Sequence, residues 1–307
     1  MTPPRSPLPQ RHGLDAAWIR TPDRDPDAGP PWPTMRAFLR DRLPDAVPLD
    51  ERLRAGAFVD QAGRPWSGDE PYRPNTFIWF HRPLRDEPVV PFPLEVLDAD
   101  DRIVVVDKPH FLATIPRGSH VRETVLVRLR VELGLPDLAP AHRLDRLTAG
   151  VLLLTSHRRH RGAYAGLFAG GGVRKTYEAL APFDPALEFP RTVVNRIEKR
   201  RGSLQAEVVP GEPNAETLIE LVERRGDLAR YRLTPTTGRT HQLRVHLTSL
   251  GLPIAGDPLY PTVLDAAPDD FGRPLALVAR RLQFTDPVDG TARDYVSRIV
   301  LAAGWTS

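Results

Sequence analysis

Residues 141–150 read AHRLDRLTAG and lead directly into VLLLT, the apolar residues 151–155. A short apolar run that begins and ends at polar residues is typical of a buried strand. Asp145 comes just before that strand, between Arg143 and Arg146, so we expect its carboxylate at a sheet edge, kept ionised by the two guanidinium groups. Such a carboxylate can act as a nucleophile, a general base or a metal ligand, although a salt-bridged aspartate at a strand entrance is the plainer interpretation.

Strand patterns outnumber helix patterns along the chain and follow in irregular order. We therefore predict an α+β fold with a mixed, mostly antiparallel sheet and helices packed on it. The expected strands are residues 103–109 (IVVVDKP), 151–155, 176–180 (TYEAL) and 231–234, and the expected helices are residues 124–133 and 240–250.

Proline content divides the chain into three parts. Residues 1–34 are rich in proline and cannot bury enough apolar surface to offset the entropy of ordering, so they are expected to form a disordered or extended tail. Residues 35–88 predict a small N-terminal module with two short helices, a strand, a turn and a final apolar strand. Residues 89–307 are expected to form the large domain.

Composition excludes several classes of protein. The chain has 307 residues and no cysteine, which rules out disulfides, thiolate metal sites and a cysteine nucleophile. It contains no apolar run long enough to span a bilayer, and its first residues lack the apolar core of a secretory signal, so we expect a soluble protein of the cytoplasm.

Basic residues are concentrated in one stretch. Residues 146–177 contain six cations and no carboxylate. A local field of this sign attracts polyanions, of which phosphate backbones are the commonest. A solvated loop without a partner is the alternative.

Residues 234–246 (TPTTGRTHQLRVH) hold a second group of polar side chains. We predict a helix here with Thr240 as its N-cap. Arg244 would project from it towards a buried edge and needs a carboxylate, for which Asp145 is the natural candidate. His241 and His246 are too far apart around a helix to make a convincing metal site.

Four motifs in the chain resemble those of the RluA-type family of RNA pseudouridine synthases. The motif at residues 142–150 is close to the family pattern HRLDRxTSG, and the order and spacing of all four motifs also agree with the family. The resemblance extends over about residues 94–300. The motifs are HRLDRLTAG (142–150), GRTHQLRVHL with the following SLGLPIAGDPLY (238–260), KTYEAL (175–180) and VVVDKP (104–109).

The resemblance implies that residues 89–307 are a pseudouridine synthase catalytic domain and that no cofactor is required. It implies Asp145 as the covalent nucleophile and Arg244 as its ionic partner. Tyr177 would stack on the target uracil and could assist proton removal at C5. Substrate-binding roles are implied for Arg143, which would enter the space left by a flipped nucleotide, and for Lys175 and Arg239. The N-terminal module is loosely similar to the small alpha-L RNA-binding module.

The expected partner is structured RNA, with ribosomal RNA favoured over transfer RNA, and neither a membrane nor an obligatory protein partner is implied. Two other functions stay open at this point. One is a catalytically silent RNA-binding or ribosome-assembly protein on the same fold. The other is a metal-dependent nuclease, which would need clustered carboxylates or paired histidines.

Overall fold

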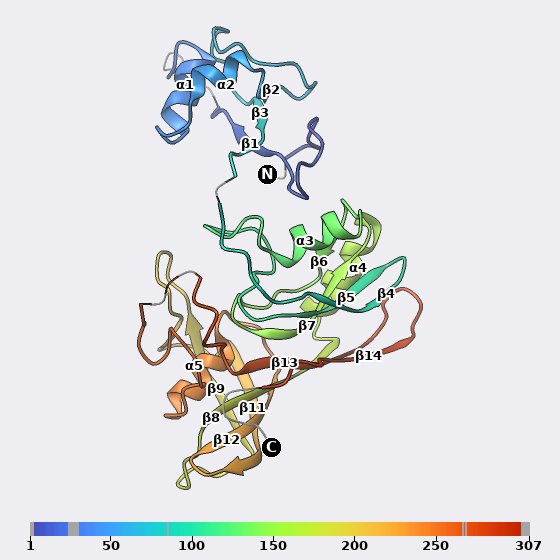
Figure 1. The fold of residues 1–307 in the computed structure, drawn as a ribbon, viewed down its shortest axis with the longest axis vertical. Helices are drawn as coiled ribbons and strands as arrows, with labels where there is room; N and C mark the ends of the chain where they lie inside the picture. The colour runs from blue at the N-terminus through green and yellow to red at the C-terminus, as the bar shows by residue number, and fades with distance from the viewer. Residues whose placement is uncertain (1–2, 24–30, 85, 266, 268, 302–307) are drawn as a thin grey trace. The chain divides into compact units, whose positions relative to one another are not determined.

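The computed structural model describes residues 3–23, 31–84, 86–265, 267 and 269–301. The chain divides into two compact units, Met1–Asp86 and Glu87–Ser307, and each is described by itself. Figure 1 labels most of the helices and strands of both units.

The first unit combines a small sheet with two short helices. Its strands lie in the order β1-β3-β2, and both neighbouring pairs are antiparallel. Thr34 caps the first helix by accepting a hydrogen bond from the backbone N–H of Ala37. The expected helices and apolar strand are confirmed. The elements are β1 (Ala17–Arg20), α1 (Met35–Arg42), α2 (Leu49–Arg54), β2 (Phe58–Val59) and β3 (Phe77–Phe80).

The structure differs from the expected tail at residues 17–20, which form β1. This strand pairs with β3 over its whole length, and Trp18 packs edge-on against Phe77 with their ring centroids 5.4 Å apart. These four residues are ordered because they pair with β3 and make apolar contacts. The proline-rich sequence around them gives no sign of this strand. Residues 24–30, also part of the expected tail, lie outside the described residues.

The second unit is built on one large sheet. Its strands follow the order β10-β9-β11-β12-β8-β13-β7-β5-β4, with β14 on β13 and β6 on β7. β13 and β7 are parallel, and every other strand pair of this sheet in the described part of the chain is antiparallel. The α+β prediction is confirmed. The elements are β4 (Glu95–Ala99), β5 (Ile103–Lys108), α3 (Val125–Glu132), β6 (Ala139–Pro140), β7 (Ala149–Thr155), α4 (Arg158–Ala169), β8 (Val173–Pro182), β9 (Arg191–Glu198), β10 (Glu207–Val209), β11 (Ala215–Arg225), β12 (Leu228–Pro235), α5 (Gln242–Ser249), β13 (Leu277–Thr285) and β14 (Ala292–Val296).

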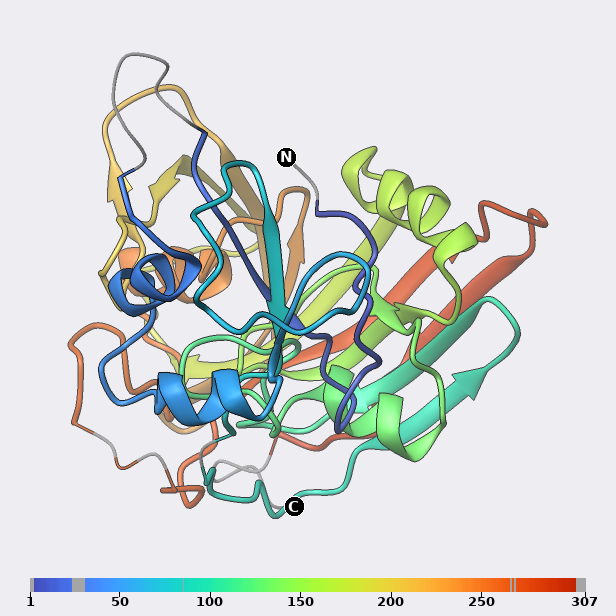
Figure 2. The same cartoon turned by 90° about the horizontal axis from the view of Figure 1, so that it is seen from above.

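β5 and β7 are buried on both faces. Alternate residues of these strands pack in two separate clusters, one containing Leu126 and Leu129 of α3 and the other containing Tyr164 of α4. Figure 2 shows the β13–β14 hairpin running alongside β4 and β5, and a hydrogen bond of 2.7 Å from Tyr295 to Asp98 joins the two hairpins. The strand that follows Asp145 is therefore held rigidly from several directions.

Gly150 allows the parallel approach of β7 to β13. Its φ is +112°, and a Cβ at this position would lie 2.3 Å from the carbonyl oxygen of Ala279. We expect Gly150→Ala to lower the free energy of unfolding by at least about 2 kcal/mol, because it adds backbone strain to a steric overlap. Urea unfolding measures this loss. The control is Gly166→Ala on α4, where a Cβ meets nothing within 4 Å, and this variant should be as stable as the parent or more so.

Candidate active site

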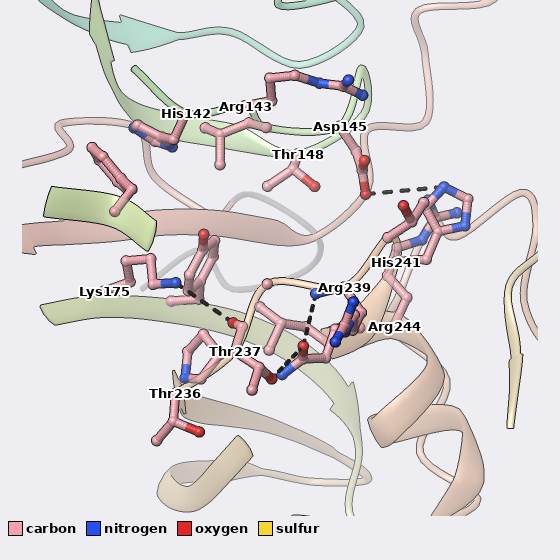
Figure 3. Close-up of a pocket in the computed structure, with 18 of the residues that line it drawn as sticks. His142, Arg143, Asp145, Thr148, Lys175, Thr236, Thr237, Arg239, His241 and Arg244 are labelled. Carbon is pink, nitrogen blue, oxygen red and sulfur yellow. Dashed lines mark hydrogen bonds and ion pairs between the residues drawn. The ribbon is translucent and has the colours of Figure 1, made fainter. Parts of the chain in front are cut away.

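Three of the four motifs, HRLDRLTAG, KTYEAL and GRTHQLRVHL, meet at one cavity of about 820 Å³ in the second unit. Its walls come from the loop before β7, from β8, and from the segment that joins β12 to α5 together with the start of that helix (Figure 3). All six predicted site residues line it: Arg143, Asp145, Lys175, Tyr177, Arg239 and Arg244.

Asp145 opens into this cavity with its side chain 34 % exposed. Within the described residues it forms no ion pair with Arg143 or Arg146, contrary to the expectation that these neighbours hold it. Arg143 is exposed, and the guanidinium of Arg146 lies 5.9 Å from the ring centre of Phe111. Asp145 Oδ2 instead faces His241 Nε2 at 4.0 Å (Figure 3). The carboxylate is thus left open to a substrate.

The loop that carries Asp145 is fixed by side chains from the end of β5 and from the segment that follows it. Lys108, fully buried, donates from Nζ to the carbonyl oxygens of Leu112 at 2.8 Å and Arg146 at 3.2 Å. Thr114 Oγ1 donates to the carbonyl oxygen of Leu144 at 2.7 Å. Burial lowers the pKa of Lys108 to about 7, and the nearby charge of Asp145 opposes that shift. These contacts preorganise the backbone on both sides of Asp145.

The expected pairing of Arg244 with Asp145 is wrong. Arg244 donates to Asp257, from Nε to Oδ2 at 2.8 Å and from Nη2 to Oδ1 at 2.6 Å. The side chains of Arg244 and Asp257 are 2 % and 0 % exposed. A buried guanidinium is best satisfied by a bidentate contact with a carboxylate. The fully buried Asp257 makes that contact, whereas Asp145 is 34 % exposed and opens into the cavity. The guanidinium also lies 5.0 Å from the ring centre of Tyr260.

The start of α5 also differs from the prediction. His241, and not Thr240, is the N-cap residue, and it has the left-handed backbone angles φ 58° and ψ 17°. Its Nδ1 lies 2.9 Å from the hydroxyl of Tyr260. Gln242 then fixes the preceding loop, because its Oε1 accepts hydrogen bonds from Thr237 Oγ1 at 2.8 Å and from the Arg239 backbone N–H at 3.0 Å.

Tyr177 and Lys175 project from β8 into the cavity. Burial and the charge of Asp145 raise the pKa of Tyr177, so its phenol is protonated at neutral pH. Burial lowers the pKa of Lys175, whose Nζ approaches the carbonyl oxygen of Thr237 at 3.5 Å. Among the described residues no carboxylate pairs with Lys175, so this cation is available to an anionic ligand.

Sequence reasoning overlooked three residues of this site. Lys108 and Asp257 stand in motifs that were quoted without a role for either residue, and His241 was considered only as a metal ligand. A lysine inside an apolar strand and an aspartate just after a glycine were the available signals for the first two. In the described part of the chain no group of three or more histidine, aspartate or glutamate side chains is arranged to hold a metal ion, and no helix is long and apolar enough to cross a membrane.

Comparisons with known proteins agree with this geometry. A family described as RNA pseudouridylate synthase matches residues 102–249. An uncharacterized RNA pseudouridine synthase of Synechocystis is 31 % identical over 213 residues, which cover 68 % of this chain and 72 % of that protein. The mitochondrial tRNA pseudouridine(32) synthase of Saccharomyces cerevisiae is 33 % identical over 59 % of this chain and 40 % of its own length. The ribosomal large subunit pseudouridine synthase D of Neisseria meningitidis is 31 % identical over 65 % of this chain and 56 % of its own length.

Comparison with solved structures finds the same fold. The structure of human RNA pseudouridylate synthase domain containing 1 superposes with a TM-score of 0.55 at 23 % identity, over 70 % of this chain and 86 % of that one. Motifs, cavity, fold and relatives coincide, and the chain belongs to the RluA-type RNA pseudouridine synthases, which are isomerases that act on RNA.

Proposed function

We propose that this chain isomerises a specific uridine of ribosomal RNA to pseudouridine, with Asp145 as the covalent nucleophile. The observation that carries the proposal is the open carboxylate of Asp145, which lies in the cavity on a rigidly held loop. A positioned carboxylate can form a covalent intermediate and so divide a difficult bond exchange into easier steps. Arg244 supports the site as a positioning residue through its contacts with Asp257 and Tyr260.

The target nucleotide must leave the RNA helix to react. A cavity of about 820 Å³ has the size of small-molecule sites and admits nucleotides, not a duplex. We propose that the uridine flips into it, that Tyr177 stacks on its base, and that Arg143 enters the vacated space. Lys175 and Arg239 would contact neighbouring phosphates. The protonated phenol of Tyr177 suits a contact with the base better than removal of a proton.

Ribosomal RNA is the proposed substrate. The Neisseria relative, named for the large ribosomal subunit, matches over 56 % of its length, against 40 % for the yeast tRNA enzyme. We also propose that Glu87–Ser307 is the catalytic unit, that Met1–Asp86 is an accessory module, and that the enzyme works in the cytoplasm on structured RNA without an obligatory protein partner.

Pseudouridine mapping tests the target. We expect carbodiimide-based mapping of total RNA from a deletion strain to lack one ribosomal pseudouridine that the parent strain contains, and the purified enzyme to restore it in vitro. Loss of a tRNA pseudouridine instead would identify tRNA, and not ribosomal RNA, as the substrate. Unchanged maps, together with tight RNA binding by the protein, would favour a silent RNA-binding role.

A further inference from the structure

His241 is the titratable side chain closest to Asp145 whose chemistry is still unassigned. Its ring is 10 % exposed, lines the cavity and directs Nε2 towards Asp145 Oδ2 at 4.0 Å (Figure 3). It occupies a left-handed backbone conformation with φ 58°, which is uncommon for any residue other than glycine. Strained residues of this kind are concentrated at functional sites.

The proton on the His241 ring is located by its neighbour Tyr260. The Tyr260 hydroxyl accepts a hydrogen bond from the backbone N–H of Ala206 at 2.6 Å and donates to the carbonyl oxygen of Ala206 at 3.0 Å. A hydroxyl has a single proton, so with that proton on the Ala206 carbonyl oxygen the 2.9 Å contact with His241 Nδ1 takes the imidazole N–H as its donor. Nε2 then carries the free lone pair of the neutral ring, and this lone pair faces the cavity.

The groups around His241 favour the neutral ring. Burial, with Arg244 and Lys199, lowers the pKa of His241 to about 4, while Asp145 and Asp257 oppose the shift. Other bases lining this cavity are less available. The phenol of Tyr177 is protonated, and Nε2 of His142 already accepts the backbone N–H of Leu153 at 3.1 Å.

The reaction needs a proton acceptor close to Asp145. Pseudouridine formation breaks the bond between C1′ and N1 and creates a bond between C1′ and C5, while C5 still carries its hydrogen. When that proton leaves, the C5–H electron pair forms the C5=C6 bond, the C6=N1 electrons move to N1, and N1 takes up a proton from water. Whether the aspartate attacks C1′ or C6, the attacked atom is bonded to C5 in the product. The departing proton is therefore close to the atom that Asp145 attacks.

We propose that His241 is the general base that removes the C5 proton, through Nε2, while Tyr260 holds the ring by Nδ1. The imidazolium formed in this step lies beside the Asp145 carboxylate and returns its proton to water, so no net proton is consumed. This inference rests on the proposed isomerisation at Asp145.

His241→Asn is the sharpest variant, because asparagine tolerates the left-handed backbone and its amide can still donate to Tyr260, yet it cannot accept a proton. We expect kcat to fall by about 10²–10⁴-fold with KM for RNA unchanged. We also expect a deuterium isotope effect on kcat with [5-²H]uridine RNA that the parent lacks, because proton removal becomes rate-limiting. The control is His246→Gln on the same helix, a buried histidine that contacts Asn195 and does not line the cavity, and it should retain activity.

RNA containing 5-fluorouridine separates removal of the C5 proton from the steps before it, because C5 of 5-fluorouridine has no proton to lose. We expect His241→Asn to consume that substrate as fast as the parent does, whereas Asp145→Asn consumes neither substrate. An equal loss on 5-fluorouridine RNA and on uridine RNA would overturn the base assignment while leaving the function intact, and so would activity restored by His241→Gln. Consumption by Asp145→Asn would instead overturn the proposed function.

Discussion

Asp145→Asn is expected to remove all pseudouridine formation while leaving fold and RNA affinity unchanged. The amide has nearly the same shape as the carboxylate but is a poor nucleophile, and covalent catalysis depends on that oxygen. Because Asp145 forms no ion pair with an arginine or lysine among the described residues, the substitution strands no buried charge. Single-turnover conversion of the substrate RNA, a filter-binding Kd and a thermal melt measure the three properties.

The matched control is Asp101→Asn. Asp101 is exposed and does not line the cavity, so its variant should behave as the parent in all three measurements. Detectable turnover by Asp145→Asn on the true substrate would remove Asp145 as the nucleophile. Lost RNA binding in this variant would show instead that the carboxylate acts in substrate recognition.

Arg244→Ala should produce the largest loss of stability, about 3–5 kcal/mol, because it leaves the carboxylate of Asp257 buried without a counter-ion. That carboxylate is fully buried, and its Oδ1 also accepts the backbone N–H of Leu259 at 2.8 Å. We expect the double variant Arg244→Ala/Asp257→Ala to lose less unfolding free energy than the two single variants lose in sum, because both charges are then removed together. Urea unfolding of the three variants measures the coupling.

An exposed pair serves as the comparison. Arg232 lies 3.7 Å from Glu220 with side chains 46 % and 37 % exposed, and Arg232→Ala should cost no more than about 1 kcal/mol. If Arg244→Ala unfolds at the same urea concentration as the parent, the Arg244–Asp257 pair does not form in solution.

Part of the second unit could be predicted from local patterns, namely strands β5, β7, β8 and β12 and helices α3 and α5. The apolar runs around Val105 and Leu153 are strands, and the helix expected over residues 124–133 is α3, which Thr124 caps. The predicted end of this helix was less accurate, because Leu133 is the C-cap residue that follows α3 and is 37 % exposed. β1 could not be predicted, since its partner β3 is some sixty residues away and a short strand depends on that partner.

The candidate site was predicted as a set of residues but not as a set of contacts. The family resemblance implied that Asp145, Tyr177 and Arg244 belong to one site, and all three line the same cavity. Both charge complementarity and the family resemblance assigned Asp145 to Arg244, whereas its partner is Asp257, because sequence does not show which acid is fully buried. The left-handed turn at His241 was likewise hidden, since the preceding threonine resembles an ordinary N-cap.

The parallel contact of β7 with β13 has a consequence for biosynthesis. Val278 and Ala279 meet Ala149 and Gly150, so the strand beside the nucleophile gains this neighbour only after well over a hundred further residues have left the ribosome. Pairings this distant in sequence form slowly, and domains fold as units during synthesis. A nascent chain that ends before β13 therefore lacks the strand that pairs with the start of β7, and the segment after Asp145 is without this neighbour until β13 has been synthesised.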